Sequence, residues 1–147
     1  MKISVLSPSI RKGGLDIVWD CLKKQTEQDF EWIAATNYEV PYAKNVGIAD
    51  KKGLYYTLNR DWNKAYQEAK GDLIVNIVDW IWFTPEVLER FFRHYQVNPK
   101  VIITTVGHQY KEIINGKPEK LVWSDPRARK DLGTFYEVAP TEMEMCL

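Results

Sequence analysis

Hydrophobic positions along this chain fall into strand-like runs that alternate with helix-like spacings. Residues 3–7 and 30–35 are short β-rich segments, and residues 73–78 form an almost unbroken apolar run of strand length. Such a run is typical of a parallel strand that is buried on both faces. Between the first two segments, apolar residues recur at i, i+3, i+4 and i+7 from Leu15 to Leu22, which predicts a helix lying on a sheet.

Capping residues delimit two further helices. Asp61 is the expected N-cap of a helix whose apolar face runs to Ala69, and Gly71 is expected to end that helix in the left-handed conformation. Thr84 and Pro85 predict the start of a later helix, with Thr84 as the cap and Pro85 in the first turn.

The remaining segments are assigned from their pattern and turn residues. Residues 38–53 show no period and are predicted as a long loop, whereas residues 54–58 and 101–106 are predicted as strands. Residues 110–114 and 120–123 flank an Asn-Gly turn and predict a β-hairpin. Strands that alternate with amphipathic helices predict an α/β domain, with a mostly parallel central sheet flanked by helices and a small hairpin near the C-terminus.

Length and charge narrow the possible functions. The chain of 147 residues fits one domain, 1–147, and its 20 basic residues balance 20 acidic ones. This balance disfavours nucleic acid as a partner. No apolar run approaches the roughly 20 residues of a membrane span, and no signal peptide is recognisable at the start. Because the two cysteines lie far apart, we expect a reducing, cytoplasmic setting.

Asp79 is the first candidate functional residue. It follows the apolar run 73–78, and ligands of open α/β sheets bind at the carboxyl ends of the strands. A carboxylate between Trp80 and Trp82 suits a metal-bound phosphate or a sugar hydroxyl. An Asp that only hydrogen-bonds the backbone of its own turn fits the same position. The sequence leaves both interpretations open.

Four segments carry a resemblance to a known family. They are Ile-Ser-Val-Leu-Ser-Pro-Ser at 3–9, Leu-x-x-Gln-Thr with Phe-Glu-Trp-Ile at 22–33, Trp-Asn-Lys-Ala with Ala-Lys-Gly-Asp at 62–72, and Asp79 with Thr-Pro-Glu-Val-Leu-Glu at 79–89. In this order they resemble the nucleotide-sugar half of inverting glycosyltransferases of the family-2 type. The resemblance implies a Rossmann-like GT-A domain that binds a UDP- or GDP-linked sugar and transfers the sugar to an acceptor hydroxyl with inversion.

The resemblance also implies a set of site residues. In the family, the first loop and the end of the second strand hold the nucleoside, and an acidic Asp-x-Asp loop binds a divalent metal on the diphosphate. Carried over to this chain, the substrate-binding residues are Ser7, Pro8, Ser9, Arg11, Asn37, Arg60 and Asp79. Asp79 is also the implied ligand of Mn²⁺ or Mg²⁺. For Arg11 and Arg60, a role as solvated surface residues stays open.

The chain departs from the family pattern, which leaves a second function open. The Asp-x-Asp motif is reduced to Asp79, and Thr36-Asn37 stands where the family has two acids. The sequence stops before the family's acceptor-binding half, so no catalytic base is assigned. The alternative is a non-catalytic binding or assembly module that keeps the fold, with Trp80 and Trp82 as a contact between copies in a homo-oligomer.

Overall fold

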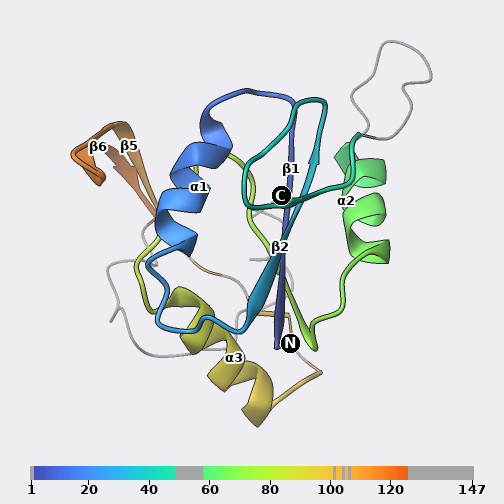
Figure 1. The fold of residues 1–147 in the computed structure, drawn as a ribbon. Helices are drawn as coiled ribbons and strands as arrows, with labels where there is room; N and C mark the ends of the chain where they lie inside the picture. The colour runs from blue at the N-terminus through green and yellow to red at the C-terminus, as the bar shows by residue number, and fades with distance from the viewer. Residues whose placement is uncertain (1, 49–57, 101, 104, 106, 126–147) are drawn as a thin grey trace. The chain divides into compact units, whose positions relative to one another are not determined.

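The computed structural model describes residues 2–48, 58–100, 102, 103, 105 and 107–125 (Figure 1). The chain divides into two compact units, Met1–Ile103 and Thr104–Leu147, which are described separately here. The elements of the first unit are β1 (Ile3–Ser9), α1 (Gly14–Leu22), β2 (Phe30–Thr36), β3 (Lys44–Asn45), α2 (Leu58–Gln67), β4 (Leu73–Asn76) and α3 (Val87–Val97). None of the described helices is long and apolar enough to cross a membrane.

The first unit is built on a four-stranded parallel sheet in the order β3-β2-β1-β4. The central strand β1 pairs with β2 along its whole length and with β4 as far as Leu6, which lies opposite Asn76. Because the described strands of this sheet are parallel, their carboxyl ends lie at one edge. The predicted α/β class, with a parallel sheet flanked by helices, is therefore confirmed for this unit.

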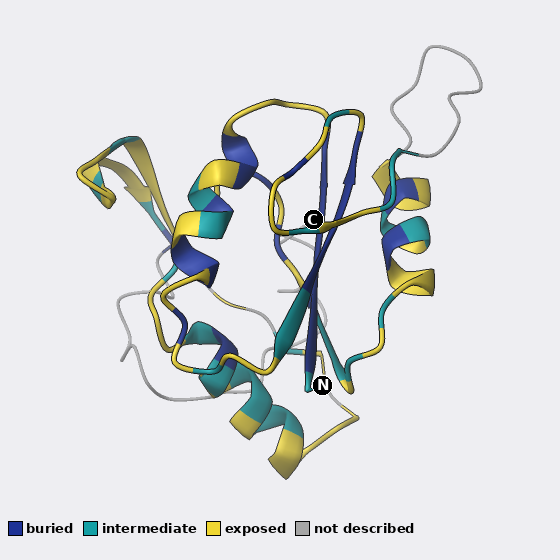
Figure 2. Cartoon of the chain, in the orientation of Figure 1, coloured by how far each residue is buried: buried dark blue, intermediate teal, exposed yellow. Residues whose placement is uncertain are grey.

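Helices cover both faces of this sheet (Figure 1), and the strands β1 and β2 between them are largely buried (Figure 2). Each face has its own apolar cluster. The strands alternate their side chains between the faces, so Val5 of β1 packs toward α1 and α3 while Leu6 packs toward α2. The cluster under α1 and α3 is formed by Ile3, Val5, Leu15, Val18, Leu22, Trp32, Ala34, Val40, Val75, Ile77 and Leu88. The cluster under α2 is smaller and is formed by Leu6, Ile33, Ala35 and Ala65.

The first strand continues through Pro8 to Ser9, two residues beyond the predicted segment 3–7. A proline in a strand costs a hydrogen bond only if its nitrogen faces a paired neighbouring strand. Backbone N–H and C=O groups of successive residues point alternately to the two neighbouring strands, so residues 6 and 8 face the same one. The Leu6 carbonyl accepts from Ile77 on the β4 side at 3.0 Å, so the nitrogen of Pro8 also points to that side. There the pairing of β1 with β4 has already ended, and the sheet loses no hydrogen bond.

Two predictions about the helix before β4 are wrong. Asp61 is not an N-cap, because α2 already includes Leu58 and Asp61 lies inside the helix, fully buried, one turn before Ala65. Gly71 does not take a left-handed conformation. Its lack of a side chain serves close packing instead, because a Cβ there would lie 2.4 Å from the backbone nitrogen of Ser4. The start of β1 therefore requires glycine at position 71.

The start of α3 also differs from the prediction. Glu86 is the N-cap residue, and no side-chain cap is made there, so Thr84 does not cap the helix. The buried side chain of Gln25 holds this segment instead. Its amide nitrogen donates to the Thr84 carbonyl at 2.9 Å, and its amide oxygen accepts from the Leu88 backbone at 3.0 Å. This link ties the end of α1 to the beginning of α3.

The strand predictions for the second half of the first unit hold only in part. β4 ends at Asn76, and Asn76 and Val78 are exposed. Both lie on the face of α2, where Ile74 is the last described residue of this segment that packs against the apolar cluster. Of the predicted strand 54–58, residues 54–57 lie outside the described residues, and Leu58 belongs to α2. Of the predicted strand 101–106, the described residues 102, 103 and 105 lie in no strand.

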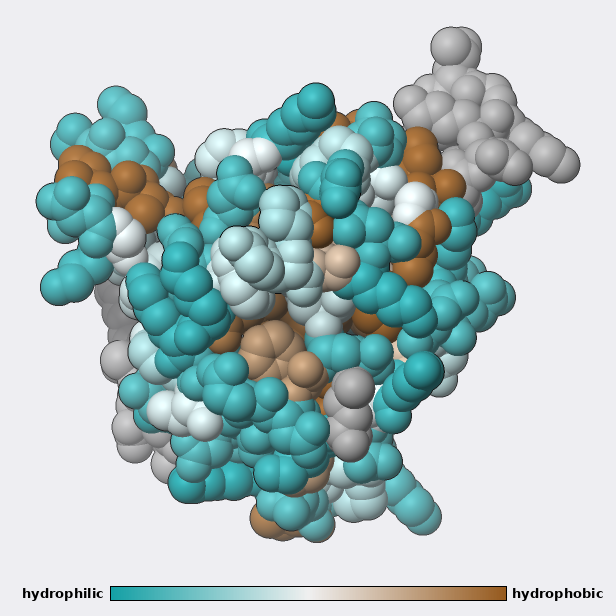
Figure 3. Space-filling model, in the orientation of Figure 1, coloured by the Kyte–Doolittle hydropathy of each residue, from teal (hydrophilic) through white to brown (hydrophobic). Residues whose placement is uncertain are grey.

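The second unit contains the predicted hairpin, formed by β5 (His108–Ile114) and β6 (Lys117–Ser124). Asn115 and Gly116 both have positive φ, at 52° and 74°, as a two-residue type I′ turn requires. The hairpin carries exposed large apolar and aromatic side chains, which are Tyr110, Ile114, Leu121, Val122 and Trp123. Figure 3 shows hydrophobic atoms in brown, among teal ones, at the upper left where the hairpin is drawn.

Candidate functional site

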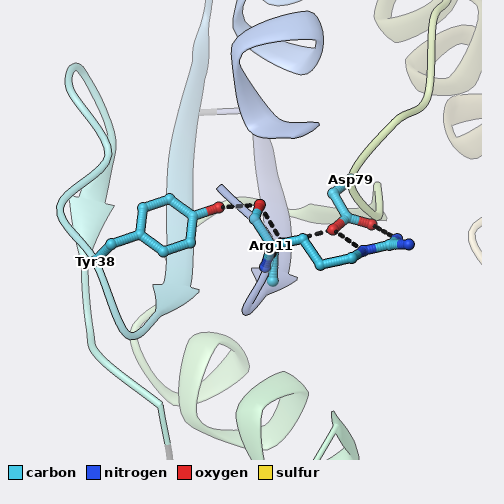
Figure 4. A network of polar contacts seen from close by, with 4 residues as sticks. Arg11, Tyr38 and Asp79 are labelled. Carbon is cyan, nitrogen blue, oxygen red and sulfur yellow. Dashed lines mark hydrogen bonds and ion pairs between the residues drawn. The ribbon is translucent and has the colours of Figure 1, made fainter. Parts of the chain in front are cut away.

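Two loops at the carboxyl edge of the sheet meet at Asp79. The loop after β4 supplies Asp79, the last residue of β1 supplies Ser9, and the loop between β1 and α1 supplies Arg11, about 70 residues before Asp79 along the chain. The Ser9 hydroxyl donates to Oδ2 of Asp79 at 2.6 Å, and Nε of Arg11 donates to the same oxygen at 2.8 Å. Nη2 of Arg11 bonds Oδ1, so the guanidinium holds the carboxylate with two parallel bonds (Figure 4).

The two partners of this ion pair differ strongly in exposure. The Asp79 side chain is 6% exposed, whereas the Arg11 side chain is 66% exposed. Burial by itself would raise the pKa of the Asp79 carboxyl, but the hydrogen bonds from Arg11 and Ser9 outweigh it and hold that pKa below its usual value. Asp79 is therefore ionised at neutral pH, and Arg11 covers it on the solvent side.

The loop that carries Arg11 is held by its own hydrogen bonds. The Arg11 backbone N–H donates to the Ser9 hydroxyl oxygen at 3.1 Å. The Tyr38 hydroxyl, which comes from the segment after β2, donates to the Arg11 carbonyl at 2.8 Å (Figure 4). Three segments of the chain thus fix the position of Arg11.

Tyr38 is a member of the site that the sequence did not single out. Burial raises the pKa of its hydroxyl, the nearby Ser9 hydroxyl lowers it, and the negative charges of Asp79 and Asp16 raise it further. The net direction is upward, so Tyr38 stays protonated at neutral pH and remains a donor. The available signal was its place two residues beyond the end of β2, at the same edge as Asp79.

The loop of Asp79 packs closely against the first turn of α1. Gly14 touches the loop so tightly that a Cβ there would lie 2.7 Å from Cβ of Asp79 and 2.7 Å from Nε1 of Trp80. The Trp80 backbone N–H donates to the Gly14 carbonyl at 3.2 Å. Trp80 itself has a φ of 62°, an unusual value for a bulky residue, and its side chain is 54% exposed.

The other predicted site residues are spread around this centre. Ser7 and Pro8 are buried, and the Ser7 hydroxyl accepts from Nε1 of Trp32 at 3.1 Å inside the core. Asn37 is exposed at the end of β2. Arg60 is exposed in the first turn of α2, on the face of the sheet opposite α1. The structure brings Ser9, Arg11 and Asp79 into direct contact.

The residues around Asp79 do not fit a protein-held metal ion. Both carboxylate oxygens already accept hydrogen bonds from a cationic or hydroxyl donor. Within the described part of the chain, no group of three or more His, Cys, Asp and Glu side chains is placed to hold a metal ion. A hard cation such as Mg²⁺ or Mn²⁺ prefers several oxygen ligands. The side chains described at this site therefore do not form a metal centre.

Comparison with known proteins leaves the family of this chain open. No protein-family model matches the sequence, and a search of curated proteins finds no match. What is established here is an α/β fold with a buried, arginine-covered carboxylate at the carboxyl edge of its parallel sheet.

Proposed function

We propose that the chain is a glycosyltransferase-like domain of GT-A type, which binds a nucleotide-diphosphate sugar at the carboxyl edge of its sheet. The observation that carries this proposal is the convergence of Ser9, Arg11 and Asp79 at that edge. In the family that the sequence resembles, the same two loops hold the nucleoside and the diphosphate. Four family-like segments in order and a parallel sheet with helices on both faces support the same reading.

The site offers chemistry that suits a departing nucleoside diphosphate. When a sugar is transferred with inversion, the acceptor hydroxyl gives its proton to a base and its oxygen bonds to the anomeric carbon, while the bond from that carbon to the diphosphate oxygen breaks. The diphosphate leaves with the electron pair, and negative charge grows on its oxygens. An arginine held in position stabilises that charge without further reorganisation. Arg11 meets this requirement, because Asp79 holds its guanidinium and Tyr38 holds its backbone carbonyl.

Thermal-shift and calorimetric titrations with UDP, GDP and their sugars test the proposal. A ligand that binds the native state raises Tm by mass action, by an amount that grows with its concentration. We expect a shift with at least one nucleotide sugar, and we expect Arg11→Ala to reduce it. Lys12→Ala is the matched control, because it removes an exposed positive charge from the same loop. If none of these nucleotides shifts Tm or gives heat of binding, the proposal is wrong.

The exposed apolar residues beside the ion pair favour a second candidate, an assembly module. Trp80, Ile81 and Val78 are 54%, 42% and 40% exposed in the loop that carries Asp79. Such residues next to one another suit a contact between copies of the chain. Sedimentation or light scattering distinguishes this candidate: self-association that is lost in Trp80→Asn would support it, since Asn tolerates positive φ better than Trp.

A further inference from the structure

The buried carboxylate of Asp79 is already neutralised by the protein itself. Its two oxygens accept two hydrogen bonds from Arg11 and one from Ser9, at 2.8 Å for Nε and 2.6 Å for the hydroxyl. A divalent ion on Asp79 would have to displace the guanidinium and bring two charges into the place of one. Asp16 carries a second negative charge that acts on this cluster, because it raises the pKa of the Tyr38 hydroxyl.

The same contacts give Arg11 a defined orientation toward solvent. A guanidinium carries its N–H donors in one rigid plane, and Nε and Nη2 of Arg11 bind Asp79. The Arg11 side chain is 66% exposed, so a ligand at the carboxyl edge can reach it. Arginine can bind a carboxylate with one edge and a phosphate with another, because its donors lie in a rigid plane.

We propose that Arg11, held by Asp79, supplies the positive charge for the diphosphate of the ligand, and that the site binds nucleoside diphosphates without a divalent metal ion. This inference rests on the proposed function. It assigns to Asp79 the task of positioning Arg11, in place of direct contact with a metal or a phosphate. Ser9 and Tyr38 support the same arrangement through the carboxylate and the Arg11 carbonyl.

Binding of UDP, GDP and inorganic pyrophosphate, measured by calorimetry in EDTA and in Mg²⁺ or Mn²⁺ at matched ionic strength, tests this proposal. We expect the Kd of the best ligand to differ less than about threefold between the two conditions. Arg11→Ala should weaken binding at least about tenfold, since charge-assisted hydrogen bonds to the diphosphate are lost. Arg11→Lys should lie between, and Lys12→Ala should bind like the unaltered protein.

A second measurement does not depend on any nucleotide. Free Mn²⁺, followed by electron paramagnetic resonance, should titrate equally in the unaltered protein and in Asp79→Asn, because Asp79 holds no metal ion. A Tm for each variant, in the absence of ligand, separates loss of binding from loss of folding.

The nucleotide experiment separates the following outcomes. Binding in EDTA that Arg11→Ala removes supports the inference, whereas binding in EDTA that Arg11→Ala leaves unchanged overturns it. Binding that needs Mn²⁺ or Mg²⁺ and is lost in Asp79→Asn overturns the inference while leaving the proposed function in place. Absence of binding for every diphosphate, with and without metal, overturns the proposed function and the inference together.

Discussion

Replacing Arg11 by alanine removes the cation from a buried carboxylate, so the effect on stability depends on pH. In the unaltered protein the pKa of Asp79 lies below its usual value. A lowered pKa contributes stability above the unfolded pKa of about 3.9, and this contribution is lost as pH falls through the folded pKa. In Arg11→Ala the carboxyl stays buried and keeps only the Ser9 hydrogen bond, so its pKa should rise.

The magnitude follows from the two hydrogen bonds between Arg11 and Asp79. A hydrogen bond to a charged group is worth roughly 1.5–3 kcal/mol, and the exposure of Arg11 favours the lower end of that range for the pair as a whole. We therefore expect the free energy of unfolding of Arg11→Ala to be about 1.5 kcal/mol lower at pH 7, with a Tm roughly 5 °C lower. As pH falls through the lowered folded pKa of Asp79, the difference should shrink, because the carboxyl then becomes protonated in both proteins.

Urea unfolding at a series of pH values measures this difference directly, with Lys12→Ala as the control of equal charge. The double variant with Asp79→Asn adds a further check, because removing the uncompensated charge should return part of the stability lost in Arg11→Ala. A loss that is the same at every pH, or no greater than that of Lys12→Ala, would refute the ion-pair reasoning.

Three further experiments test the packing and chemistry around the site. Gly14→Ala should lower the free energy of unfolding in a urea titration by about 1–3 kcal/mol, because an added Cβ has no room beside the loop of Asp79. Gly107→Ala is the control and should be nearly neutral, because no described atom lies within 4 Å of a Cβ at that position. Gln25→Ala should cost about 1–3 kcal/mol by thermal unfolding, because the buried Leu88 N–H and the partly buried Thr84 carbonyl lose their partner. Cys21 is buried, and burial raises the pKa of its thiol. In a Cys146→Ser background, the native protein should therefore resist a thiol reagent at pH 7 and react only when it is unfolded. Rapid labelling of the native protein would contradict this.

Sequence patterns predicted the parts of the fold that depend on local periodicity. The apolar spacing of α1, the β-rich segments of β1 and β2, and the Asn115-Gly116 turn all predicted elements that the structure contains. The errors occurred where a contact between distant segments decides the conformation. Gly71 is needed because Ser4 lies against it, and Thr84 is held by Gln25 in place of a cap. Neither contact leaves a signal in the neighbouring residues.

The candidate site shows the same division. The position of Asp79 after an apolar run predicted its place at the carboxyl edge, and the resemblance brought Ser9 and Arg11 into one group with it. The sequence could not predict that Arg11 binds Asp79, since the side chain of an arginine reaches several neighbours and its choice depends on loop geometry. Tyr38 was missed for the same reason, because its hydroxyl bonds a backbone carbonyl of another loop.

The ion pair with Arg11 gives the single acid at position 79 a possible function other than binding a metal ion. With one acid in place of two, a metal-centred site would lack ligands, and the resemblance alone would favour loss of function. An arginine that covers this acid provides a positive charge at the same place, so one carboxylate is sufficient if its task is to hold Arg11. Variants of Asp79 should then reproduce the binding defect of Arg11 variants, whereas a metal ligand would leave Arg11 dispensable. Nucleotide binding measured for both variants, in EDTA and in metal, therefore distinguishes a carboxylate that positions Arg11 from one that holds a metal ion.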